Sequence, residues 1–206
     1  MNLDKLFQTG IGISLIGFVW WAWPRPAGGY YSPYRSGPAT YHHGPAVLID
    51  RGHWNESAAD PGFVALARVL TGDGYSVSIN RQELVPELLQ TAKVLVVSDA
   101  LGFTGWLGSF GVRIRGNAFH GDEVEAVRDW VRAGGSVLLV ADRPPAVDAA
   151  RPLASALGVS IADEAYRELD RGRVVVITTQ LADPHNRAID SRNTMLGILH
   201  WLSHAE

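Results

Sequence analysis

Four short aliphatic runs, separated by stretches of helical periodicity, constrain the fold of this chain more than any other feature. Each run holds at least four consecutive apolar residues and is followed by polar ones. Such near-continuous apolar strands are typical of a parallel sheet that helices cover on both faces. Right-handed crossovers then leave few topologies, and a flavodoxin-like strand order is our prediction. The four runs are residues 46–50, 93–99, 136–142 and 173–179.

The segments between these runs predict the helices and the remaining strands. Apolar residues recur at helical spacing in four segments, and a fifth helix interrupted by Pro86 is expected over 82–90. Two further short strands are expected at 75–79 and 159–161, and residues 101–121 are expected to form a long loop over the sheet edge. The predicted fold is therefore a three-layer α/β fold with a doubly wound, mostly parallel sheet. The four helical segments are residues 61–74, 122–135, 146–157 and 193–203.

Composition excludes several classes of function. The 206 residues suffice for one domain, and the net charge of −3 comes without the basic stripe of a nucleic-acid-binding protein, so no nucleic-acid partner is expected. The chain contains no cysteine, which excludes disulfides, thiolate metal sites and cysteine nucleophiles.

Residues 7–23 form an uncharged, largely apolar stretch that follows Lys5 and ends in three tryptophans. Its length of about 17 residues is near the lower limit for a membrane helix. We expect a retained signal anchor in the lipid bilayer, because Trp20 and Arg25 disfavour the small-residue pattern of a cleavage site. A cleaved signal peptide and a buried or interfacial helix are the alternatives. The positive charge is similar on both sides and does not set the orientation.

This interpretation divides the chain into three parts. Residues 1–23 are the expected signal-anchor segment, residues 24–45 a linker rich in Pro, Gly and Tyr, and residues 46–206 the α/β domain. The expected location is the bacterial inner membrane, with a single membrane pass and the domain on the periplasmic side.

Polar residues follow several of the predicted strands, at the edge where ligands bind in open α/β sheets. Carboxylates and a histidine gathered there suit acid–base chemistry, and the candidate catalytic residues are Asp50, His53, Asp99 and Asp142. Asp50, His53 and Asp142 are also candidate ligands for a divalent metal, the one cofactor considered. The further candidates for ligand binding are Asn55, Trp54, Ser98, His120, Arg143 and His185.

Each of these residues also has a structural alternative. Aspartates just past strands often cap helices or form turns, and His53 alone could bond a loop carbonyl. The chain has neither a phosphate-binding G-x-x-x-x-G-K-[ST] loop nor a G-x-S-x-G motif. Its nearest pattern, from Ser98 to Gly102, has Ala100 where a nucleophile would stand.

Several segments carry a resemblance to a known group of proteins. The motif Asp50-x-x-His53-x-Asn55, the segment Ala141-Asp142-x-x-Pro145 and the runs 94–102, 119–145 and 192–202 resemble a bacterial domain family. That family belongs with the class I glutamine-amidotransferase-like, or trehalose-utilisation-like, flavodoxin-type folds. The resemblance covers about residues 46–203 and implies such a fold. Arg143 replaces a histidine of the family pattern, and the missing cysteine excludes glutamine hydrolysis by a Cys-His-Glu triad.

Three functions compete. The first is a membrane-tethered, non-catalytic binding or scaffolding domain of the cell envelope, with an envelope protein or a small polar ligand as partner. The second is a hydrolase that uses the acidic rim, with or without a metal ion. The third is a carbohydrate-binding domain in which Trp54 and Trp106 serve as stacking platforms, the alternative for Trp106 being core packing or loop anchoring.

Overall fold

A computed structural model describes residues 39–55, 61–101, 104–107, 112–141, 144–178 and 192–204. Its main feature is a six-stranded sheet in the order β2-β1-β3-β6-β8-β7. The first five strands in this order are parallel, and β7 runs antiparallel to β8 at the edge. The predicted α/β fold and its flavodoxin-like arrangement are confirmed. The strands are β1 (Ala46–Asp50), β2 (Ser76–Asn80), β3 (Val94–Ser98), β6 (Ser136–Val140), β7 (Ala165–Leu169) and β8 (Gly172–Ile177).

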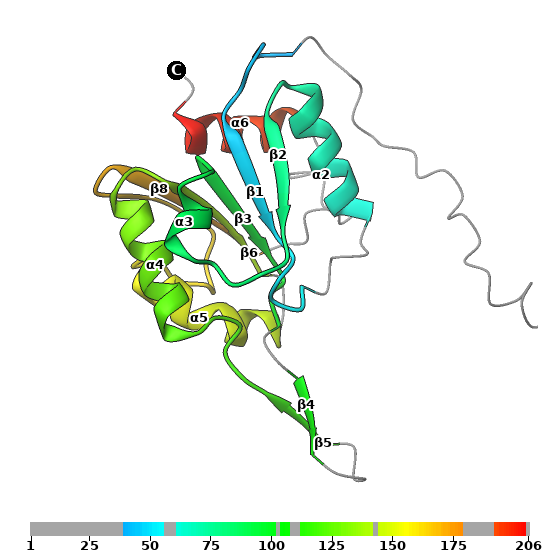
Figure 1. The fold of residues 1–206 in the computed structure, drawn as a ribbon, viewed down its shortest axis with the longest axis vertical. Coiled ribbons are helices and arrows are strands. Elements are labelled where there is room, and N and C mark those ends of the chain that lie inside the picture. Colours follow the sequence, from blue (N-terminus) through cyan, green and yellow to red (C-terminus); the bar gives the residue numbers. More distant parts are fainter. Residues whose placement is uncertain are drawn as a thin grey trace, which may run out of the picture. The chain divides into compact units, whose positions relative to one another are not determined.

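Helices cover both faces of this sheet (Figure 1). One core cluster joins alternate strand residues, such as Leu48 and Leu95, to α3, α4 and α5. The other joins the opposite set, such as Val47 and Val96, to α2 and α6. Because side chains alternate along a strand, apolar runs of this kind supply both cores at once. The helices are α2 (Pro61–Gly72), α3 (Pro86–Leu89), α4 (Gly121–Arg132), α5 (Ala146–Ala156) and α6 (Arg192–Ser203).

Three predicted elements differ from the structure. The expected loop 101–121 contains an antiparallel hairpin, β4 (Thr104–Leu107) with β5 (Val112–Arg115). The expected strand at 159–161 is irregular, and β7 follows it instead. Pro86 does not interrupt a helix but begins α3, where the missing N–H of proline is harmless.

The prediction of a transmembrane signal anchor finds no support in the structure. Among the described residues, no helix is long and apolar enough to cross a membrane. Residues 7–23, on which that prediction was based, lie outside the described part of the chain.

The chain enters the domain at the amino edge of the sheet, beside the turn that precedes β2. Thr40 donates from its N–H and its hydroxyl to the Asp73 carboxylate, at 3.2 and 2.8 Å. The Tyr41 N–H donates to the Asp73 carbonyl, and the other Asp73 carboxylate oxygen lies 2.8 Å from His200 Nε2 on α6. Gly74 has φ +94°, and a Cβ there would collide with the Tyr41 carbonyl. This contact fixes residues 40 and 41 between α2 and α6.

Candidate functional site

Asp50, the last residue of β1, anchors a turn at the carboxyl edge of the sheet. Its side chain is fully buried and accepts hydrogen bonds from the Gly52 N–H (3.1 Å) and from the side-chain amides of Asn80 (3.2 Å) and Asn55 (3.3 Å). Gly52 is required here, because a Cβ would lie 2.6 Å from the Gln82 carbonyl oxygen. Asp50 is therefore held in place as a hydrogen-bond acceptor.

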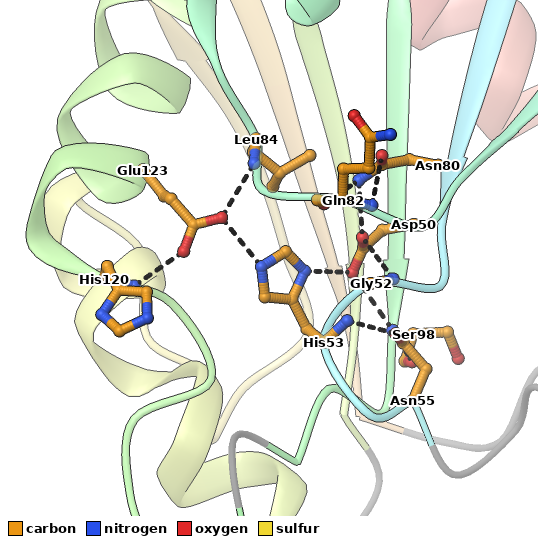
Figure 2. Close-up of polar contacts among 10 residues, drawn as sticks. All are labelled: Asp50, Gly52, His53, Asn55, Asn80, Gln82, Leu84, Ser98, His120 and Glu123. Carbon is orange, nitrogen blue, oxygen red and sulfur yellow. Dashed lines mark hydrogen bonds and ion pairs between the residues drawn. The ribbon is translucent and has the colours of Figure 1, made fainter.

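His53 connects Asp50 to a second buried carboxylate (Figure 2). Its Nδ1 lies 2.8 Å from Asp50 Oδ2, and its Nε2 lies 2.9 Å from Glu123 Oε1. Burial alone would lower the pKa of His53, but the hydrogen bonds and negative charges of Asp50 and Glu123 outweigh it and raise the pKa above its ordinary value. Both ring nitrogens donate when the imidazole is protonated, and the three side chains then form a buried carboxylate–imidazolium–carboxylate triad.

Glu123 carries this network to the start of α4. Its Oε1 also accepts the Leu84 N–H at 2.8 Å, and its Oε2 accepts the His120 N–H at 2.9 Å. Glu123 is 3% exposed and His53 is 6% exposed. The Asp50–His53–Glu123 triad therefore ties together the β1 turn, the segment before α3 and the first turn of α4.

The triad holds Trp54 at the surface. Trp54 lies between two buried residues, His53 and Asn55, and is 62% exposed with φ 54°. The His53 carbonyl accepts the Leu101 N–H at 3.0 Å, and the Asn55 amide donates to the Ser98 carbonyl at 2.8 Å. The β1 turn is thus bonded to the loop after β3 on both sides of Trp54.

Asp99 lies in this second loop, between the two bonded positions. It also has a left-handed backbone conformation, with φ 47°, and its carboxylate accepts the Ser98 hydroxyl at 3.1 Å. The residue at the bend after β3 is therefore Asp99, and both Asp99 (8% exposed) and Ala100 (1% exposed) are buried. Two non-glycine residues with positive φ on paired loops are uncommon, and such backbones cluster at functional sites.

The structure brings together part of the predicted rim. Asp50, His53, Asn55, Ser98 and Asp99 are buried neighbours, Trp54 is exposed beside them, and exposed His120 contributes its backbone N–H to Glu123. Three predicted residues lie outside the described part, namely Asp142, Arg143 and His185, as does the side chain of Trp106. Within the described residues, no group of three His, Asp or Glu side chains is arranged to hold a metal ion.

Sequence reasoning missed Glu123 and Asn80. Glu123 is 70 positions from His53, and Asn80 is 30 positions from Asp50. Glu123 stands third in α4, where a glutamate commonly bonds back to the N-cap N–H. That signal predicts a cap, but not the second bond to His53.

Comparisons with known proteins are sparse. No family model and no curated protein matches the chain. Among solved structures, it is similar to an exo-β-1,4-mannosidase from Opitutaceae bacterium strain TAV5, with a TM-score of 0.40 and 13% sequence identity. The match covers 76% of this chain and 33% of that chain, so this chain spans about a third of the mannosidase. A likeness at this level says nothing about activity.

Proposed function

We propose that this domain binds a carbohydrate at the carboxyl edge of its sheet, on the exposed side chain of Trp54, without hydrolysing it. The observation that carries the proposal is the exposed indole of Trp54. The backbone of this residue has a left-handed conformation, and hydrogen bonds of the buried residues on both sides hold it there. An exposed indole on a fixed backbone offers a flat apolar face on which a sugar ring can stack.

The position in the sheet supports a ligand site there. In the order β2-β1-β3-β6, the chain moves from β1 to β2 on one side and then to β3 on the other. This change of direction places the switch point of the sheet between β1 and β3. Ligands of open α/β sheets bind outside the carboxyl ends of the strands at such a point. Trp54 follows β1 and Asp99 follows β3.

The hydrolase alternative is less well supported, because its predicted base is already engaged. His53 has a carboxylate at each ring nitrogen, and Asp50 accepts bonds from Gly52, Asn55 and Asn80 as well. A general base must reach the proton that it removes, whereas both nitrogens of His53 point at buried partners. These contacts favour a structural role for the pair.

Calorimetric titration with soluble cello-, manno-, xylo-, chito- and malto-oligosaccharides tests the binding. We expect wild-type protein to bind at least one series and Trp54→Ala to weaken it by about tenfold or more, a loss of about 1.4 kcal/mol. Tyr166→Ala is the matched control, because Tyr166 is 61% exposed but lies on the distant edge strand β7. Absence of binding to every series, or binding that Trp54→Ala leaves intact, would refute the proposal.

A second assay tests the absence of hydrolysis. Wild-type protein is incubated with 4-nitrophenyl glycosides, acetate and phosphate, and we expect no release of nitrophenol above the buffer rate. Asp99→Asn keeps the shape of the side chain and tolerates the left-handed backbone. Turnover by the wild type that disappears in Asp99→Asn, at unchanged thermal stability, would show that the site is catalytic.

A further inference from the structure

The outer edge of β2 presents backbone groups that no other described strand pairs. The Ser76 N–H donates to the Pro45 carbonyl at 3.2 Å, and the Asn80 carbonyl accepts the Arg51 N–H at 2.9 Å, so both residues bond toward β1. Successive residues of a strand direct their backbone groups to opposite sides. The N–H and C=O groups of Val77 and Ile79 therefore point away from β1, toward the open edge.

The two edges of the sheet differ in their protection against further pairing. β7, at one edge, carries the exposed charges of Arg167 and Glu168. β2, with the sequence SVSIN, has no charge and no proline, and its Ile79 is 51% exposed. Proteins usually protect a lone edge with charges, prolines or bulges, and an edge without them is a pairing surface.

The sequence of β2 is complementary to itself in one antiparallel register. With a two-fold axis at Ser78, Val77 of one copy lies opposite Ile79 of the other, and both apolar side chains lie on the same face. The outward N–H and C=O groups of these residues then form the hydrogen-bonded pairs, while Ser78 faces its own counterpart in a non-hydrogen-bonded pair. An axis at Val77 or Ile79 would leave part of β2 unpaired.

We propose that β2 pairs antiparallel with β2 of a second copy of this chain, about a two-fold axis at Ser78, to form a symmetric dimer with one continuous sheet. In an isologous interface the same surface of each copy contacts the other, so β2 alone can supply both sides. The proposal is independent of the carbohydrate site, which lies at the carboxyl ends of β1 and β3 rather than along the edge of β2.

Cysteine cross-linking in the full chain tests the register. Because the chain has no native cysteine, any disulfide must involve the introduced residue. The Cα atoms of a non-hydrogen-bonded antiparallel pair lie about 4.5 Å apart, which suits a disulfide. We expect Ser78→Cys to form a disulfide-linked dimer under mild oxidation, seen on a non-reducing gel. Ser76→Cys is the matched control on the same face of β2, since its counterpart would lie about 13 Å away. Equal cross-linking of both variants would refute the register.

Sedimentation velocity of the unmodified full chain tests the dimer itself. We expect a concentration-dependent dimer at micromolar to millimolar protein. We expect Ile79→Lys to raise the dissociation constant by about tenfold or more, because it places a charge on the edge and removes the apolar pair with Val77. Ile79 is half exposed, so the fold should tolerate the change, which circular dichroism checks. Tyr166→Lys, on the opposite edge, should leave the dimer intact. A wild-type monomer throughout this range would overturn the proposal.

Discussion

Replacing Glu123 by glutamine tests whether the Asp50–His53–Glu123 triad is structural. A glutamine that keeps its oxygen toward His53 and Leu84 must turn its NH₂ group toward the His120 N–H, so one of the three bonds is lost. The bond to His53 also loses one of its charges. A hydrogen bond to a charged group contributes about 1.5–3 kcal/mol, and an unpaired buried donor costs about 1–3 kcal/mol. We expect Glu123→Gln to lower the free energy of unfolding by about 3 kcal/mol, near the range for a broken buried ion pair.

Urea denaturation followed by circular dichroism measures this loss, and the midpoint of thermal unfolding should fall by about 6–12 °C. Glu125→Gln is the matched control, because Glu125 lies on the same helix but is exposed. Its effect should stay within about 0.5 kcal/mol. If the two variants are equally stable, the triad does not hold the β1 turn and our reasoning is wrong.

The pH dependence gives a second test of the same variant. The folded-state pKa of His53 is raised, in part by Glu123, so its contribution to stability is fully present below the ordinary histidine pKa of about 6.5. That contribution is lost as the pH rises through the raised pKa. The stability difference between wild type and Glu123→Gln should therefore be larger at pH 6 than at pH 9. A difference that grows with pH would contradict the raised pKa of His53.

Two further predictions concern other parts of the domain. Trp54 has φ 54°, and only glycine accepts this backbone without strain. Trp54→Gly should therefore be about 1 kcal/mol more stable than Trp54→Ala. Urea denaturation of the two variants checks this, and a more stable alanine variant would contradict it. Burial acts to raise the pKa of Asp73, but the hydrogen bonds of His200 and Thr40 outweigh burial and lower the pKa. The contribution of Asp73 to stability is therefore present above the ordinary aspartate pKa of about 3.9 and disappears as the pH falls through the lowered value. Asp73→Asn should therefore speed amide exchange over residues 40–44 by about tenfold at pH 7 in hydrogen-exchange mass spectrometry, whereas exposed Asp163→Asn should not; unchanged exchange would contradict the contact.

The sequence was most informative where burial was complete. The runs that became β1, β3, β6 and β8 are apolar on both faces, and this composition leaves little choice but a covered parallel strand. β7 has the sequence AYREL and is exposed at its three central positions, so the pattern that marks a buried strand is missing. A strand that pairs on one side at a sheet edge needs no such pattern, and neither does the short β4–β5 hairpin.

Part of the site was accessible for a similar reason. Asp50 and His53 stand three positions apart, so their proximity follows from the local chain, and Asp99 joins them once the parallel order of β1 and β3 is known. Glu123 is different, because its contact with His53 depends on how the first turn of α4 packs against the sheet. The missed partner also changed the interpretation. With Glu123 in place, His53 changes from a candidate base into the centre of a buried triad.

The segments at the amino and carboxyl ends of the parallel strands are held in place by similar chemistry but serve different purposes. At the amino edge, Asp73 and His200 hold the entering chain at Thr40. At the carboxyl edge, the Asp50–His53–Glu123 triad holds a turn whose most exposed side chain is Trp54. A buried ion network is seldom the most stable solution for a core, since well-packed apolar residues often do as well. Its value here is geometric: the triad fixes the two residues that flank Trp54, and so the strained backbone of Trp54 stays beside Asp99, at the switch point of the sheet.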